Sequence, residues 1–203
     1  MGINKFTALN DEEFERTYLG LKVEHNKDIK VEKIHPKKRG LGDPTSRNWV
    51  TEVNLQNVQN QGSCGSCWAF ASVTGVEFVL KIDEGTEVAL SNQQVMDCSY
   101  SVYGRPSYFG CNGGFFSAPL YYAKYHSLFP ESRYPYTARN QPCYWYRLLS
   151  GSAYSIQSWG RLSRTCDAVA NYVLNTGTVM VAVYVHSGWG SYSSGVFDCR
   201  SVS

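Results

Sequence analysis

The sequence lacks an apolar run long enough for a membrane-spanning helix, and the residues after Met1 lack the apolar stretch of an export signal. It contains no Asn-x-Ser or Asn-x-Thr glycosylation acceptor. It has no large excess of either charge, since 19 basic and 17 acidic residues leave a net charge of +2. This balance gives no reason to expect a nucleic acid or a membrane surface as a partner.

Cysteine is abundant by contrast, and seven cysteines in 203 residues suggest a protein of an oxidising compartment. Such cysteines without an export signal suggest that the N-terminus is incomplete. The composition is 43% hydrophobic and 14% aromatic, which is enough for a substantial core. The length allows one large domain or two small ones.

Residues 61–70 read Gln-Gly-Ser-Cys-Gly-Ser-Cys-Trp-Ala-Phe and form the most specific motif of the chain. A Gly- and Ser-rich turn there leads into an apolar stretch that continues to Leu80. The sequence therefore predicts that Cys67 opens a buried helix, where backbone N–H groups and the helix dipole stabilise a thiolate. Gln61 can place its side-chain amide beside the sulfur and donate to a developing oxyanion. A nucleophile beside an oxyanion donor is half of an acyl-transfer site.

Two other chemistries are open to the pair Cys64-x-x-Cys67. A redox dithiol requires a βαβ setting and a cytosolic protein, and neither is evident. A zinc site requires a second ligand pair at matching spacing, and no further Cys-x-x-Cys or His-x-x-x-His occurs. We therefore predict no metal and no cofactor.

Three motifs resemble those of the papain and cathepsin L family of cysteine peptidases. They are residues 61–70, the tetrad Cys111-Asn112-Gly113-Gly114, and Tyr134-Pro135-Tyr136 followed by Cys143. The resemblance implies an α+β fold with a mostly helical left domain and a right domain of antiparallel strands, which is incomplete in this chain. It also implies a cleft that holds an extended peptide, with Cys67 as the nucleophile and Gln61 as the oxyanion donor.

The glycines of the tetrad indicate where a substrate backbone approaches, because Gly113 and Gly114 have no Cβ to obstruct it. By resemblance, Gly114 pairs with the substrate main chain as an added strand does. Phe115, Phe116 and Ala182 are then the positions that line the pocket for the second residue before the scissile bond. The alternative for the two phenylalanines is ordinary core packing.

The resemblance also assigns the cysteines. It pairs Cys64 with Cys111 and Cys98 with Cys143, and it leaves Cys67 free. It implies that Cys199 pairs with a cysteine beyond Ser203, while Cys166 has no counterpart.

The chain is predicted to contain three parts. They are residues 1–42, the remnant of an inhibitory propeptide with a linker; residues 43–150, the left domain; and residues 151–203, the start of the right domain. Gly2-x-Asn4-x-Phe6 resembles part of the propeptide pattern, and maturation cleavage is expected near Gly42 or Asp43.

Local patterns predict the limits of several elements. The helix from Cys67 should end near Gly85, and Ser91 with Gln94 should open a short helix that runs to Cys98. Residues 99–110 should form a surface loop. The apolar, β-branched run 179–185 should be a buried strand.

No catalytic base is assigned among the four histidines, His25, His35, His126 and His186. The family's histidine opens an apolar strand, and no such strand begins at His186. The base and its orienting asparagine are expected beyond Ser203, so this chain alone is predicted to be inactive. A truncated gene product, a splice variant or a decayed copy would share this feature.

The leading hypothesis is a papain-like cysteine endopeptidase, made as a zymogen for a lysosome-like or extracellular space. Its partners would be peptide or protein substrates, its own propeptide and cystatin-like inhibitors. A second hypothesis is a catalytically inactive homologue that binds peptides or partner proteins through the cleft. A third is a thiol oxidoreductase that uses Cys64 and Cys67.

Overall fold

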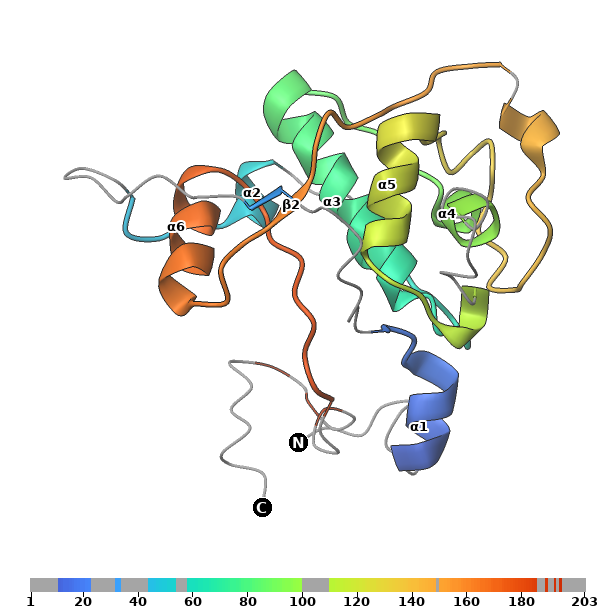
Figure 1. Cartoon of the computed structure of the whole chain (residues 1–203), viewed down its shortest axis with the longest axis horizontal. Helices are drawn as coiled ribbons and strands as arrows, with labels where there is room; N and C mark the ends of the chain where they lie inside the picture. Colours follow the sequence, from blue (N-terminus) through green and yellow to red (C-terminus); the bar gives the residue numbers. More distant parts are fainter. Residues whose placement is uncertain are drawn as a thin grey trace.

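Helix α3 (Cys67–Glu84) runs through the middle of the molecule (Figure 1). Helices α4 (Asn92–Cys98) and α5 (Ser117–His126) lie on one side of it, and α2 (Trp49–Glu52) and α6 (Cys166–Asn175) lie on the other. The remaining elements are α1 (Asp11–Tyr18), β1 (Glu32–Lys33), η2 (Gly110–Asn112), η3 (Trp145–Leu148) and β2 (Gly160–Arg161). The computed structural model describes residues 11–22, 32–33, 44–53, 58–99, 110–148 and 150–185, and the single residues 189, 192 and 194.

Helix α3 is central because apolar residues occur on nearly all of its faces. Its buried side chains are those of Trp68, Ala69, Ser72, Val73, Val76, Phe78 and Leu80. The helix ends as predicted at Gly85, which has the left-handed φ of 67° and donates its N–H to Lys81 O at 3.2 Å. A helix buried over this length holds its first residue, Cys67, in a defined place.

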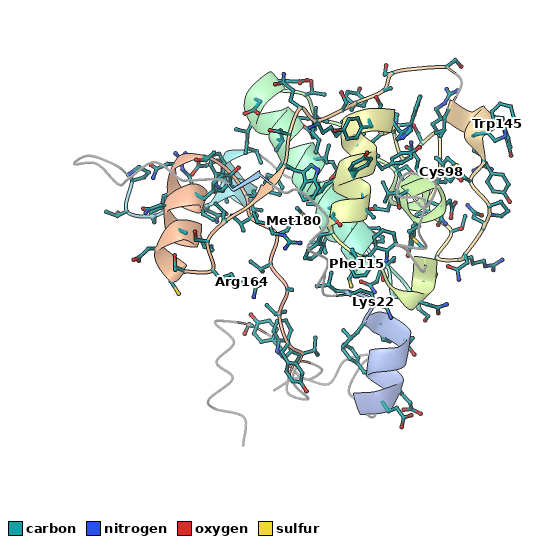
Figure 2. The ribbon with its side chains drawn as sticks, in the orientation of Figure 1. Lys22, Cys98, Phe115, Trp145, Arg164 and Met180 are labelled. Carbon is teal, nitrogen blue, oxygen red and sulfur yellow. A yellow bond between two sulfur atoms is a disulfide. The ribbon has the colours of Figure 1, made fainter. Side chains whose placement is uncertain are left out.

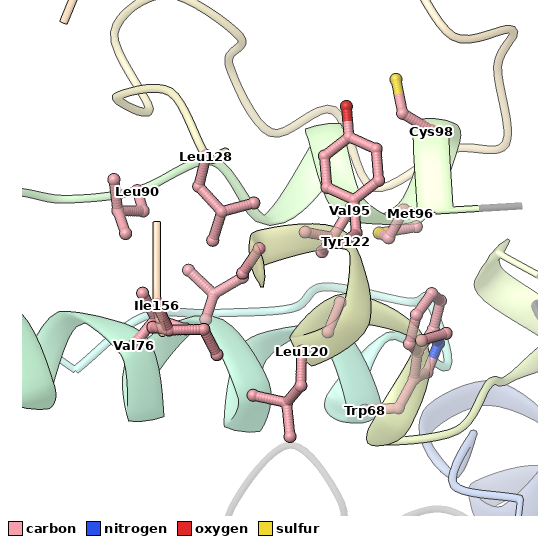
Figure 3. Packing of buried hydrophobic residues seen from close by; sticks show 14 of the residues in the cluster. Trp68, Val76, Leu90, Val95, Met96, Cys98, Leu120, Tyr122, Leu128 and Ile156 are labelled. Atoms are coloured by element: carbon pink, nitrogen blue, oxygen red, sulfur yellow. The ribbon is translucent and has the colours of Figure 1, made fainter. Parts of the chain in front are cut away.

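An apolar cluster joins α3 to α4, α5 and the segment after α5 (Figure 3). Trp68 comes from α3, Val95 and Met96 from α4, and Leu128 from the segment after α5, and none of the four is more than 1% exposed. Helix α4 begins as predicted, because the Ser91 hydroxyl oxygen accepts from the backbone N–H that follows three residues later. In the part of the chain that the structure describes, no helix is both long and apolar enough to cross a membrane.

The residues around α2 hold the far end of α6. Trp49 Nε1 donates to Val173 O at 2.7 Å, and Arg47 Nε donates to Leu174 O at 3.2 Å. Both carbonyls belong to the last turn of α6, where they have no intrahelical partner. Strand β1 also pairs with β2 in parallel. Segments before α3 are therefore fastened to residues 160–175.

The segment 179–185 is not a strand, so that prediction is wrong. It has no regular structure, and its side chains are largely exposed, with Val181 at 60%, Val183 at 56% and Tyr184 at 87%. An apolar run becomes a buried strand only where other strands complete its hydrogen bonds and cover its faces. Among the described residues no strand flanks this segment, and residues 150–185 contain only α6 and the two-residue β2.

Candidate active site

Cys67 is the first residue of α3, and its thiol is free and half-buried. The turn before it is held by backbone bonds, because Ser66 N–H donates to Cys64 O at 2.8 Å and Phe70 N–H donates to Ser66 O at 3.1 Å. The turn therefore places the thiol at the N-terminus of an 18-residue helix. The first N–H groups of a helix have no acceptor within it, so this position suits an anion.

Gln61 lies against the same turn. Its Nε2 donates to Cys64 O at 2.7 Å and to Tyr18 O at 2.8 Å. Tyr18 is the last residue of α1, so the predicted oxyanion donor is already hydrogen-bonded to a peptide carbonyl of the N-terminal segment. An amide that holds a carbonyl oxygen in this place is equipped to hold an oxyanion.

The N-terminal segment continues across the molecule as a strand added to Gly114. Gly114 N–H donates to Gly20 O at 2.7 Å, and Lys22 N–H donates to Gly114 O at 2.8 Å. The backbones are so close that a Cβ on Gly20 would lie 1.7 Å from Gly65 O. Pairing of this kind is strand addition, as the sequence predicted for a substrate, but here the chain's own N-terminal segment takes part.

The two glycines of the tetrad are also required by what lies next to them. A Cβ on Gly114 would come within 2.4 Å of the Trp68 ring, so the strand lies directly on this indole. Gly113 has a φ of +107°, and a Cβ there would lie 2.2 Å from Gly20 O. Both positions therefore need glycine, one for steric reasons and the other for its backbone conformation as well.

A cavity of about 740 Å³ borders this segment, and Leu21, Phe116, Met180 and Ala182 are among its lining residues. Two of the predicted pocket positions are thus on its wall. The third, Phe115, is half-buried and is not among the described residues that line the cavity. In Figure 2, Phe115 and Lys22 lie near the end of α3 that carries Cys67, whereas Met180 lies between α3 and α6.

Two disulfide bonds join Cys64 to Cys111 and Cys98 to Cys143, which are the pairs that the resemblance implies. Because Cys64 is bonded to Cys111, it is not the redox partner of Cys67. Among the described residues, Cys67 and the exposed Cys166 carry free thiols. Cys199 lies outside the described residues.

Two carboxyl groups of the helical core, the partly buried Glu77 on α3 and the buried Asp97 on α4, have pKa values raised toward neutral. Burial raises the pKa of Glu77 to about 7, although Leu90 N–H donates to its carboxylate at 2.7 Å. Burial likewise raises the pKa of Asp97 to about 6, although the hydrogen bonds that its carboxylate accepts lower the pKa in part. The side chains that donate to Asp97 are those of Gln93, Tyr134 and Gln141.

The histidines leave the base unassigned. His126 is the last residue of α5, and its ring stacks on that of Tyr122 with the centroids 5.1 Å apart. His25, His35 and His186 lie outside the described residues, as do the segment 195–199 and most of the predicted loop 99–110.

Comparison with known proteins identifies the family. The family described as papain family cysteine protease matches residues 43–203. The chain belongs to the papain family. Cathepsin L 1 of Paramecium tetraurelia is 32% identical over 196 residues, which cover 97% of this chain and 59% of the relative. The probable cysteine protease RD21B of Arabidopsis thaliana is 32% identical over 200 residues, which cover 98% of this chain and 42% of the relative.

Solved structures of the papain family show the same fold. Digestive procathepsin L2 from the larval midgut of Tenebrio molitor superposes with a TM-score of 0.84 at 28% identity. The match covers 99% of this chain and 64% of the procathepsin chain. The chain thus spans 42% to 64% of the length of the three papain-family relatives named here.

Three residues at the site were missed by the sequence analysis: Tyr18, Leu21 and Met180. The first two belong to a Tyr-Leu-Gly-Leu stretch that begins with the last residue of α1, and a glycine between two leucines was a usable sign of close backbone contact. Met180 packs toward α3, where a Cβ on Gly75 would lie 3.4 Å from its sulfur. Its place depends on residues about a hundred positions away, so no local pattern identifies it.

Proposed function

We propose that the protein is a cysteine endopeptidase that hydrolyses peptide bonds through an acyl-enzyme on Cys67. The observation that carries this proposal is the carbonyl of Tyr18, which accepts from Gln61 Nε2 at 2.8 Å beside the turn that carries the thiol. With a substrate carbonyl in that place, the Cys67 thiolate attacks the carbonyl carbon. The resulting oxyanion is held by Gln61 Nε2 and the Cys67 backbone N–H. The amine then leaves with a proton that a base must supply.

We infer that residues 1–42 act as an inhibitory propeptide. In support, residues 18–22 occupy Gln61 and pair with Gly114, the two groups that a substrate needs. The similarity to a procathepsin agrees with a zymogen. Cleavage near Gly42 or Asp43 would free the cleft for peptide or protein substrates and for inhibitors of the cystatin type.

We also propose a preference for a bulky apolar residue two positions before the cut bond. Phe116, Met180 and Ala182 give the neighbouring cavity an apolar wall, and Leu21 of the N-terminal segment already borders it. Burial of a leucine-sized side chain is worth about 1.5–3 kcal/mol. Profiling on a peptide library checks this preference, and selection of Arg or Asp at that position would contradict it.

The location that fits the proposal is a lysosome-like or extracellular space. Two disulfide bonds are stable in an oxidising compartment, and carboxyl groups with raised pKa values favour the folded state in an acidic one.

The proposed activity is tested with a fluorogenic peptidyl amide. Chain 1–203 should show no turnover, and a chimera that continues with the corresponding end of Tenebrio procathepsin L2 should hydrolyse the amide after its N-terminal segment is removed. Turnover should disappear with Cys67→Ser. A processed chimera that binds peptide without cleaving it would instead support the inactive homologue. Turnover by 1–203 that is lost with Cys67→Ser would show that one of its own four histidines serves as the base.

A further inference from the structure

Tyr136 contacts the turn that carries the nucleophile, although it lies 70 residues from Ser66 in sequence. Its hydroxyl donates to Gln61 O at 2.7 Å and lies 2.7 Å from Ser66 Oγ. Its ring meets that of Phe70 edge to face, with the centroids 4.9 Å apart and the planes at 85°. One side chain thus touches the beginning of the turn, its end and the first turn of α3.

The protons of this network can be assigned. The phenol has one proton, and the Gln61 carbonyl can only accept, so Tyr136 donates to it. The 2.7 Å bond to Ser66 then runs from the serine hydroxyl to the phenol oxygen, which is the nearer acceptor, since Cys64 O lies 3.4 Å from the same hydroxyl. Burial raises the pKa of Tyr136 above its ordinary value of 10.0, so the phenol keeps its proton and remains a donor.

We propose that Tyr136 is a positioning residue for acyl transfer, which holds the Gln61 amide in register with the Cys67 sulfur. The backbone of Gln61 sets where its amide lies, and Ser66 directly precedes the nucleophile. The phenol links these two points, and an oxyanion donor must be held within about 0.5 Å of its productive place. The inference rests on the proposed function, because register between the two groups matters only if both act on one carbonyl.

Tyr134 provides a matched control two residues away. Its hydroxyl donates to Asp97 Oδ2 at 2.9 Å and accepts from Tyr144 N–H at 3.0 Å. Pro135 separates the two tyrosines, and their hydroxyls bind different parts of the molecule. The Tyr134 hydroxyl also lies 3.4 Å from Pro142 O, so its removal deletes at least as many hydrogen bonds as removal of the Tyr136 hydroxyl. Only the Tyr136 hydroxyl lies at the nucleophile turn.

The test uses a peptidyl aldehyde, because this reaction needs no leaving group. All variants are made in the 203-residue chain that carries Gly20→Ala, since the added Cβ would lie 1.7 Å from Gly65 O and should release residues 18–22 from Gln61 and Gly114. The Cys67 sulfur adds to the aldehyde carbon, the carbonyl electron pair moves to oxygen, and the thiol proton ends on that oxygen to give a hemithioacetal. A carbon-13 label at the aldehyde reports the adduct. Tyr136→Phe should weaken adduct formation about tenfold, which is less than the full loss of an oxyanion donor. Tyr134→Phe should change it by no more than about twofold.

Alkylation of Cys67 by iodoacetamide, followed by peptide mapping, gives a readout without an oxyanion. Its rate should stay within about twofold of the parent chain in both tyrosine variants, since the thiol itself is intact. An equal loss in alkylation and in aldehyde binding would mean that Tyr136 only supports the fold, and would overturn the proposal. If Tyr136→Phe does not fold, Ser66→Ala removes the serine half of the link and should weaken the aldehyde about threefold.

Gln61→Ala separates failure of this inference from failure of the proposed function. If Gln61→Ala leaves aldehyde binding unchanged, Gln61 is not the oxyanion donor and the proposed function loses its basis. If it weakens binding while Tyr136→Phe does not, the positioning role is refuted and the proposed function stands. When Tyr136→Phe is combined with Gln61→Ala, it should weaken aldehyde binding by no more than a further factor of about two. If its full effect is added to that of Gln61→Ala, Tyr136 does not act through Gln61.

Discussion

Glu77 should make the free energy of unfolding depend on pH in the direction that favours acid. Its pKa rises from 4.5 to about 7 in the folded chain because the carboxyl is buried, and the charge of Glu131 adds to the rise. Between these values the folded chain keeps the proton and the unfolded chain releases it, so stability falls as pH increases. One pKa unit is worth about 1.4 kcal/mol, so the folded chain should be about 3 kcal/mol less stable above pH 7 than below pH 4.5 through this group alone.

Glu77→Gln keeps an oxygen that can accept from Leu90 N–H and removes the titration. Urea unfolding followed by tryptophan fluorescence at a series of pH values should give a flatter pH profile for the variant. The free energy of unfolding of the variant should equal that of the parent chain in acid and should be about 3 kcal/mol larger above neutral pH. Asp97 titrates in the same direction in both proteins, so the difference between the two profiles reports Glu77 together with its coupling to Glu131.

Glu84→Gln is the control, because it makes the same chemical change at an exposed position of the same helix. Its profile should follow that of the parent chain. Parallel profiles for Glu77→Gln and the parent chain would refute the reasoning, since they would show that Glu77 has the same pKa in the folded and the unfolded chain.

Two further predictions concern the N-terminal segment and the second disulfide. Gly20→Ala should release the N-terminal segment, because the new Cβ would lie 1.7 Å from a backbone oxygen. Since two backbone hydrogen bonds are then lost, alkylation of Cys67 should become about tenfold faster. An unchanged alkylation rate would mean that the segment does not cover the thiol. Cys98→Ser with Cys143→Ser should lower the free energy of unfolding by about 3–4 kcal/mol for a loop of 45 residues, as measured in urea, whereas Cys166→Ser should leave it unchanged.

Features set by a few neighbouring residues were predictable from the sequence. The end of α3 at Gly85 and the start of α4 at Ser91 follow from local capping, which needs no information from the rest of the chain. The nucleophile turn and the two disulfide pairs carry motifs specific enough to recognise. The papain-like fold followed from those motifs rather than from periodicity.

Features set by distant residues were not predictable. The hydroxyl of Tyr136 meets Gln61 across 75 positions, and nothing near either residue indicates the contact. The run 179–185 has a strand-like composition, but composition specifies a strand only together with its partners. The need for glycine at position 114 was expected from a substrate, whereas the structure adds the Trp68 ring as a second reason.

The bonds from Trp49 and Arg47 to the end of α6 have a consequence for folding during synthesis. Trp49 leaves the ribosome 124 residues before its acceptor, Val173. At about 5–20 residues per second, that interval lasts about 6–25 s. Helices α3, α4 and α5 are synthesised within this interval, so they can pack together before α2 has α6 to bind. Docking of α2 onto α6 is therefore a late step, and until then the Trp49 indole and Arg47 Nε lack the carbonyl acceptors that α6 provides.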